Sequence, residues 1–326
     1  MIDFRYHLVS IIAIFLALAV GLVVGATALA PKTEIILRKA QTELSKNNAN
    51  LTKDKQALTN QVSADQSFAA AAAPRLLSGL LKGEKVVLVV APGADGSVTT
   101  GVTTALHQAG ASITGTVNLS SNFLDTSGQN EATLTQLAQS LALKAGVTLP
   151  TRSASAVAGQ QDAAQVLAAT LLNPLGVAAS GSNTQAILSA FSNFLSLASG
   201  GTTLAPAQLA VLVTPGGTAP QPGSEVLAAL AVALRNAGSG TVMAGAVSSI
   251  GSGSVISAED SAGQVSTVDN ADTETGQIIT VQALRLLLDG KAPKQYGIGP
   301  QSAPSPAPTP SPTATPSTSA STGGHR

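Results

Sequence analysis

The sequence predicts an α/β protein whose body is a mostly parallel sheet with Rossmann-like βαβ units. Two aliphatic runs, residues 86–90 and 209–213, each lead into a Gly/Pro turn and a helical pattern. Ahead of them come 23 residues without a formal charge and then leucines at seven-residue intervals. The expected parts are a transmembrane anchor (1–31), a coiled-coil-like helical stalk (32–73), the α/β body (84–298) and a disordered tail rich in Pro, Ser and Thr (299–326).

The composition limits the chemistry that the 326 residues can perform. The absence of Cys excludes a disulfide framework, a Cys-based zinc site and a thiol nucleophile. The formal net charge of zero argues against nucleic acid as a partner, because nucleic-acid binding needs a basic field. The charge is unevenly distributed: residues 1–85 carry 10 basic and 6 acidic side chains, and residues 86–298 carry 6 and 11. This division indicates a modular, membrane-linked protein.

The uncharged segment at residues 8–30 would form a helix about 34 Å long, enough to cross the hydrocarbon core of a bilayer. A cleaved signal peptide is the alternative, since residues 26–28 and 28–30 resemble small-residue cleavage sites. The length of the apolar run and the position of Pro31 favour an uncleaved anchor. The lipid bilayer is therefore a predicted partner of this chain.

The charges that flank the span leave its orientation open. Arg5 precedes it, whereas Lys32, Arg38 and Lys39 follow it, so the positive-inside rule alone would place the body in the cytoplasm. The absence of Cys and the Ser/Thr/Pro tail are typical of exported proteins, and a long translocated domain can override a modest charge bias. We therefore expect a single-pass protein with its body outside the cytoplasm.

Two patterns in the first part of the chain are compatible with a homodimer. Small residues recur every four positions in the span and include Gly21 and Gly25, which form a GxxxG motif. After the span, one seam position is occupied by leucine in four consecutive heptads: Leu37, Leu44, Leu51 and Leu58. The alternating seam position is mostly polar, which argues against a stable free-standing dimer. A helical stalk of roughly 50 Å that is supported by a partner or by the membrane helix is favoured. The alternative is one amphipathic helix packed on the protein's own body, ending at residues 69–73 and Pro74.

The sequence of the body predicts two similar βαβ units separated by helices. The first contains a strand at 86–90, a helix that Gly110 ends, and a strand at 112–119; the second contains a strand at 209–213, a helix at 224–236 and a strand at 241–247. Other helices are expected at 131–143, 161–172, 184–198 and 276–288. The pattern favours a mostly parallel sheet of four to six strands.

The loops at residues 92–96 and 215–217 follow parallel strands, at the edge where open α/β sheets bind ligands. Their glycines could let backbone amides approach an anion. Neither loop completes a phosphate or dinucleotide fingerprint, and tight βα turns need Gly in any case. Turn chemistry is the favoured interpretation, with a ligand site as the alternative.

No catalytic residue and no cofactor-binding residue can be assigned, and we expect the chain not to be an enzyme. The three histidines, His7, His107 and His325, are far apart in sequence, and no nucleophile-elbow motif occurs. The one acidic concentration lacks EF-hand spacing, which favours a solvated loop or helix caps over a cation site: Glu259, Asp260, Asp269, Asp272 and Glu274.

Soft-metal ligands are scarce in this chain. Cu(I) prefers thiolate and thioether ligands, and the chain has no Cys and two Met, one of them the initiator. The other, Met243, lies inside an expected strand. A dedicated Cu(I) site within one chain is therefore not expected, and the metal-ligating residues remain unknown.

The two ends of the chain resemble one protein family. Residues 1–31 (MIDFRYHLVSIIAIFLALAVGLVVGATALAP) look like the start of the actinobacterial MctB family of copper transport proteins of the outer membrane. Residues 266–273 (STVDNADT), with Gly276 and Tyr296-Gly297, are similar to its C-terminal signature. The resemblance implies a cell-envelope protein of copper homeostasis, with copper as cargo. It supplies no ligand motif that can be placed on residues of this sequence.

Three functions follow from these observations. The resemblance favours a membrane-anchored envelope protein of copper homeostasis or copper export. The second is a structural or scaffolding protein of envelope or septal cell-wall organisation, acting through its stalk and a partner protein, since some relatives are linked to that role. The third is an exported ligand-binding domain that uses the Pro-Gly loops.

Overall fold

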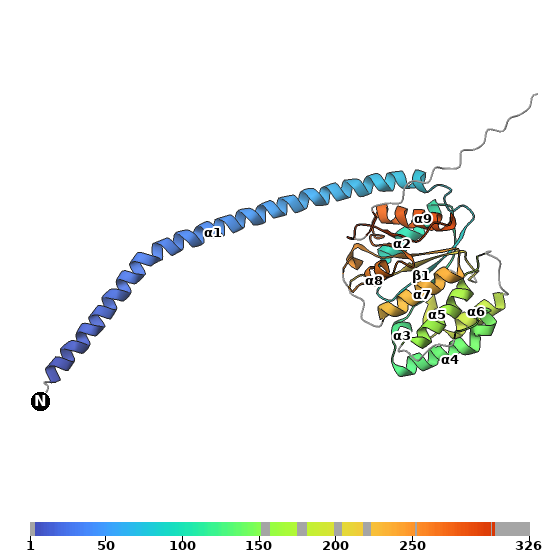
Figure 1. Cartoon of the computed structure of the whole chain (residues 1–326). Coiled ribbons are helices and arrows are strands. Elements are labelled where there is room, and N and C mark those ends of the chain that lie inside the picture. The colour runs from blue at the N-terminus through green and yellow to red at the C-terminus, as the bar shows by residue number, and fades with distance from the viewer. Residues whose placement is uncertain are drawn as a thin grey trace, which may run out of the picture. The chain divides into compact units, whose positions relative to one another are not determined.

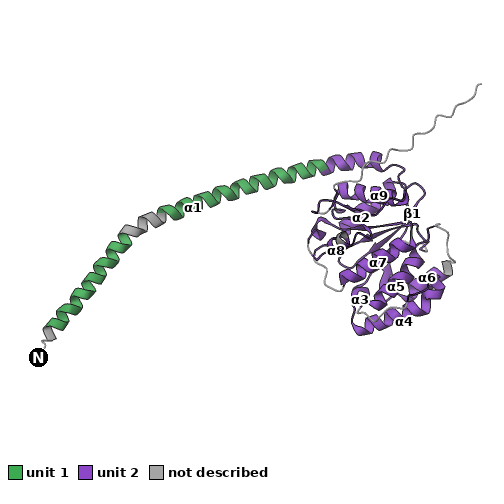
Figure 2. Ribbon diagram, viewed as in Figure 1, with its two compact units in different colours: residues 1–65 green, residues 66–326 purple. Residues whose placement is uncertain are grey.

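The computed structural model describes residues 4–150, 157–174, 181–198, 204–217, 223–251, 253–300 and 302–303. The chain divides into two compact units, residues 1–65 and residues 66–326 (Figures 1 and 2). From residue 304 onward, the predicted tail (299–326) lies outside the described residues. Its first residues belong to the body, because Ala303 donates its N–H to the Gln295 carbonyl at 2.9 Å and its carbonyl accepts from Gly297 at 3.0 Å.

Helix α1 (Phe4–Leu77) contains both the expected anchor and the expected stalk in one continuous stretch of 74 residues. Its segment Tyr6–Thr27 is 22 residues long with a mean hydropathy of 2.9, which is sufficient by length and composition to cross a membrane. The helix passes through Pro74 and ends at Leu77, later than predicted. Proline removes one backbone hydrogen bond, and the buried side chains of Ala73 and Leu77 on either side of it stabilise this last turn.

Within the described residues, seven strands form one sheet in the order β3-β2-β1-β4-β5-β6-β7. All neighbouring pairs are parallel except β2–β3. The strands are β1 (Lys85–Val90), β2 (Ser112–Leu119), β3 (Leu195–Leu197), β4 (Leu209–Val213), β5 (Gly240–Ala244), β6 (Ser266–Val268) and β7 (Gln295–Tyr296). The prediction of a mostly parallel sheet is confirmed, and the predicted count of four to six strands is wrong, because β3, β6 and β7 are too short to carry a periodic pattern.

Helices cover both faces of the sheet (Figure 1). One face carries α3 (Ser121–Leu124), α4 (Gly128–Ala145), α5 (Ala158–Leu171), α6 (Gly181–Ala190), α7 (Gly223–Ala237) and α8 (Val255–Ala262). The other carries α2 (Gly96–Gln108), α9 (Glu274–Leu288) and the end of α1. Successive residues of β1 point to opposite cores: Val87 joins the first layer and Leu88 joins the second. This burial on both faces explains why the strand sequences are continuous aliphatic runs.

The helix predicted at 184–198 is wrong in its second half. Helix α6 ends at Ala190, and residues 195–197 pair antiparallel with β2 as β3. The chain turns at Phe191 and Phe194, whose side chains are both buried in the core. The Phe194 carbonyl accepts the Ser120 N–H at 2.9 Å, which fixes the start of the strand beside β2. Burial of two aromatic side chains therefore outweighs the local helical periodicity.

Candidate functional site

The loops after β1 and β4 meet at the point where the strand order of the sheet reverses. Such a reversal is where open α/β sheets bind ligands. Here the two loops contact each other: Ala94 and Pro215 form an isolated antiparallel bridge, and the Ala91 N–H donates to the Val213 carbonyl at 2.9 Å. A Cβ added at Gly93 would lie 3.6 Å from the Cβ of Pro215. That distance is an ordinary van der Waals contact, so the glycine is explained by its positive φ of +77° in this turn.

Asp95, at the end of the first loop, caps helix α2. Its carboxylate accepts the Ser97 backbone N–H at 2.8 Å, and the hydrogen bonds from Ser97 lower the pKa of Asp95 below its ordinary value. No Lys or Arg occurs in residues 91–96 or 214–217. The observed contacts support the turn interpretation of both loops, because each polar group described there serves the backbone.

The acidic segment is not a solvated loop, as one of the two predicted interpretations held. Asp269 is only 2 % exposed, and its carboxylate accepts from Ile298 N at 2.8 Å, Gly299 N at 2.9 Å and Ser302 Oγ at 2.7 Å. We name this set the Asp269 clamp. Glu259 is equally buried and accepts from Gln264 N at 2.8 Å and Val265 N at 2.7 Å. Both carboxylates therefore accept hydrogen bonds from backbone N–H groups of the same chain, and Asp269 also accepts one from a hydroxyl.

The other predicted interpretation was that acidic side chains cap the helix after residue 275. The described side chain that caps α9 is Thr273 instead, and Glu274 lies in the first turn of the helix. The Thr273 hydroxyl accepts the Gly276 N–H at 3.1 Å at the start of α9, and the Asp272 carboxylate accepts the Val247 N–H at 2.9 Å. The Gln66 side-chain oxygen accepts the Glu274 N–H at 2.8 Å. The side chain of Asp260 lies outside the described residues.

Two glycines of the same region are required by close approach. Gly297 has φ +134°, and a Cβ there would overlap the Asp269 carboxylate. A Cβ at Gly276 would overlap the Asn270 carbonyl oxygen. The C-terminal signature therefore has a structural explanation: residues 266–273, Gly276 and Gly297 connect β6, α9 and β7.

Metal ligands are not brought together by the fold. Among the described residues, no group of three or more His, Cys, Asp or Glu side chains could hold a metal ion. His107 is exposed on α2, and Met243 is fully buried in β5 within the aliphatic core. His325 lies outside the described residues. The side chains described here offer no cluster suited to Cu(I).

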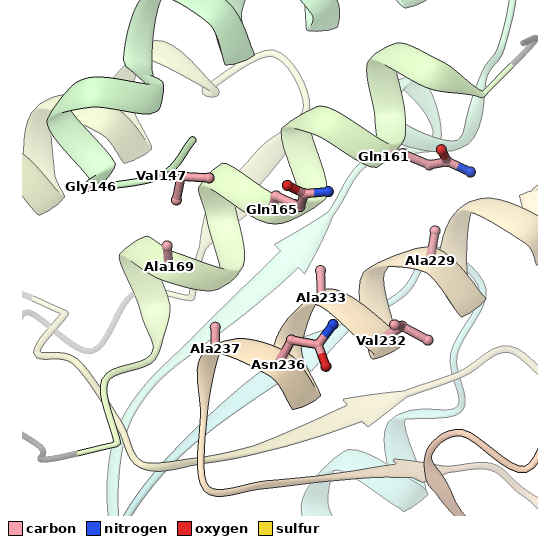
Figure 3. Close-up of a pocket in the computed structure, with 10 residues that line it drawn as sticks. All are labelled: Gly146, Val147, Gln161, Gln165, Ala169, Ala229, Val232, Ala233, Asn236 and Ala237. Carbon is pink, nitrogen blue, oxygen red and sulfur yellow. The ribbon is translucent and has the colours of Figure 1, made fainter. Parts of the chain in front are cut away.

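A groove between α5 and α7 was not predicted from the sequence. It has a volume of about 620 Å³ and is lined by Gly146, Val147, Gln161, Gln165, Ala169, Ala229, Val232, Ala233, Asn236 and Ala237 (Figure 3). None of these ten side chains is charged, and three are amides. The signal that could have indicated it is the run of alanines on the facing sides of the two helices, since small side chains leave space between packed helices. The groove offers hydrogen bonds and apolar surface without acid–base groups.

These features define a class: a three-layer α/β protein that carries an N-terminal helix long and apolar enough to cross a membrane. The described part of its body contains no cluster of metal ligands. The chain belongs to the MctB family, because the family described as "Copper transport outer membrane protein, MctB" matches residues 1–307. It is similar to the curated copper transporters MctB of Mycobacterium tuberculosis and Mycobacterium bovis. Each is 29 % identical over 253 residues, which cover 75 % of this chain and 78 % of the relative. The family predicted from the two ends of the sequence is confirmed.

Proposed function

We propose that this chain is a membrane-anchored protein of the cell envelope that acts in copper homeostasis or copper export. The observation that carries the proposal is the family match over residues 1–307, which includes both the apolar helix and the α/β body. The curated relatives are named copper transporters. The proposed topology is a single pass with the body outside the cytoplasm, and the outer-membrane location rests on the name of the family.

In the proposed function, the chain takes part in copper homeostasis without a Cu(I) site of its own. Its two methionines are the initiator and the buried Met243, and it has no Cys. The apolar segment Tyr6–Thr27 contains one ionisable side chain other than Tyr6, His7 at its edge, so it cannot line a path for a cation across the bilayer. Copper movement would then depend on an assembly of several chains or on a partner protein.

Titration of the purified full-length protein with Cu(I) against a chelator is expected to show no tight stoichiometric binding, because no soft-ligand cluster exists among the described residues. A variant with a Cys-x-x-Cys insertion at the N-terminus provides the positive control. If one Cu(I) per unmodified chain stays bound in competition with the chelator, the proposal that the chain has no Cu(I) site of its own is wrong.

Deletion of the gene is expected to raise cell-associated copper while the position of the septa stays unchanged. Copper content by mass spectrometry and septum position by microscopy should be measured in the same cultures, with the deletion complemented by the intact gene. Unchanged copper combined with misplaced septa would overturn the copper proposal and support the scaffolding function instead.

A further inference from the structure

One face of α1 in the first unit carries large apolar side chains that the structure leaves open. The leucines at the predicted seam, Leu37, Leu44, Leu51 and Leu58, are 62–66 % exposed. An open groove of about 490 Å³ follows the second half of this face and is lined by Leu51, Asp54, Lys55, Leu58, Thr59, Val62 and Ser63. Aliphatic side chains at a strict seven-residue spacing along a continuous helix form the surface that a second helix covers in a coiled coil.

We propose that this face binds the same face of a second copy of the chain, as a parallel, in-register, two-stranded coiled coil. We name the interface the leucine seam; it consists of Leu37, Leu44, Leu51 and Leu58 at the d positions and Gln41, Asn48, Lys55 and Val62 at the a positions. The proposal is independent of the copper function. A second copy is the proposed occupant because Asn48 can pair with Asn48, and Lys55 with Asp54, across a two-fold axis.

Asn48 occupies an a position between two leucine layers. In a parallel, in-register dimer each Asn48 side chain faces the other and can exchange amide hydrogen bonds with it. A register shifted by one heptad would place Asn48 opposite Gln41 or Lys55 of the second copy, so the symmetric Asn48–Asn48 pair would be lost. Asn48 therefore favours the two-stranded state at some loss of stability, and the in-register arrangement keeps its symmetric amide pair.

Asp54 and Lys55 make the seam complementary in charge. Lys55 is at an a position, and Asp54 precedes it at a g position. In a parallel dimer the g residue of one helix flanks the a residue of the other, so each Lys55 ammonium lies beside the Asp54 carboxylate of the second copy. Both side chains line the open groove. The two charges that would oppose burial at this layer thus form two symmetric pairs.

Insertion in a membrane supports the parallel arrangement. Every chain carries the apolar segment Tyr6–Thr27 at the same end of α1, so neighbouring copies have the same direction. Confinement to the bilayer also raises the effective concentration of a seam whose a positions are mostly polar. Gly25 precedes Leu37 by twelve residues, which places it about 120° around the helix from the leucines. The proposal accordingly rests on the leucine seam, without the Gly21/Gly25 stripe.

Because the chain lacks Cys, one introduced thiol reports the interface. We propose Gln41→Cys in the seam and Lys39→Cys on the outward f position as its matched control, both in the full-length protein in native membranes with a mild oxidant. Gln41→Cys should form a disulfide-linked dimer at about ten times the yield of Lys39→Cys. A tenfold ratio corresponds to a free-energy preference of about 1.4 kcal/mol for pairing through the leucine seam over pairing through the outward face. Equal yields at the two positions, or a mixed disulfide of Gln41→Cys with a different protein, would overturn the proposal.

Co-expression of two differently tagged copies tests the register. Gln41→Cys and Lys55→Cys are about 21 Å apart along a parallel, in-register dimer, so a mixed 41–55 disulfide should not exceed the Lys39→Cys background. An antiparallel dimer centred on Asn48 would place these two positions opposite each other. A dominant 41–55 product would therefore overturn the proposed register.

Charge exchange identifies the occupant as a second copy. In the Gln41→Cys background, Asp54→Lys should lower the disulfide yield about fivefold, because it replaces two attractive pairs with two repulsive ones. Adding Lys55→Asp should restore the yield. These positions are exposed on α1, so the substitutions leave the folding of the body unaffected. No loss with Asp54→Lys, or loss without recovery in the double variant, would overturn the proposed pairing.

Discussion

Replacement of Asp269 by Asn is expected to lower the free energy of unfolding of the body by about 3 kcal/mol, because hydrogen bonds to a charged acceptor contribute roughly 1.5–3 kcal/mol each. The carboxylate accepts from two backbone N–H groups and one hydroxyl, all within 2.9 Å. An amide keeps the shape but turns an NH₂ group toward one or more of these donors. The chain after β7 then loses its attachment to the end of β6.

Equilibrium unfolding in urea should measure this effect, with far-UV circular dichroism for the whole chain and Tyr296 fluorescence for the neighbourhood of β7. Tyr296 is buried beside the clamp and the chain has no Trp, so a Tyr6→Phe background leaves Tyr296 as its one tyrosine. Asp272→Asn is the matched control, since the half-buried Asp272 accepts one backbone bond, from Val247, and its loss should cost about 1 kcal/mol. Equal destabilisation by the two variants would show that the clamp contributes no more than a single loop contact.

The four long strands were predictable because each carries enough residues to show its pattern. Val86 to Val90 and Leu209 to Val213 are aliphatic at every position, and a strand buried on both faces requires that. Strands β6 and β7 contain three and two residues, too few for any period. Their positions come from pairing with the sheet and from the Asp269 clamp, which joins residues about 30 positions apart in sequence.

The acidic segment shows why site chemistry was harder to predict than the fold. Asp269 and Glu259 look solvated in sequence because carboxylates are usually exposed. Burial becomes favourable only when several donors converge on each carboxylate, and those donors come from residues 298–302 in one case and 264–265 in the other. The groove between α5 and α7 has the same origin: alanines predict a helix, whereas the space beside them depends on which helices pack together.

The end motifs were informative about the family without revealing their chemistry. Residues 266–273 predicted membership through resemblance, and the structure gives the physical reason for several of them. Thr273 caps α9, and Gly276 allows the Asn270 carbonyl to approach the helix. Asp269 accepts hydrogen bonds from Ile298, Gly299 and Ser302. These signature residues stabilise the fold. They therefore identify the family but do not indicate which ligand its members bind.

Replacement of Gly276 by Ala is expected to lower the free energy of unfolding by about 3 kcal/mol, although Gly→Ala inside a helix ordinarily stabilises by up to about 1 kcal/mol. Gly276 is a buried residue in the first turn of α9, and an added Cβ would overlap the backbone oxygen of Asn270. A backbone atom cannot move away as a flexible side chain can, so the turn between β6 and α9 must shift. Thermal unfolding should show a decrease in Tm of roughly 6–12 °C.

Two matched glycines separate this contact from helix propensity. Gly128, the first residue of α4, has open space where a Cβ would lie, so Gly128→Ala should change stability by less than about 0.5 kcal/mol. Gly101 in α2 faces the end of the Gln277 side chain, which can rotate, so Gly101→Ala should fall between the other two variants. A Gly276→Ala protein as stable as Gly128→Ala would mean that the β6–α9 turn adapts without strain. In that case the approach of the Asn270 carbonyl would not explain the glycine at position 276.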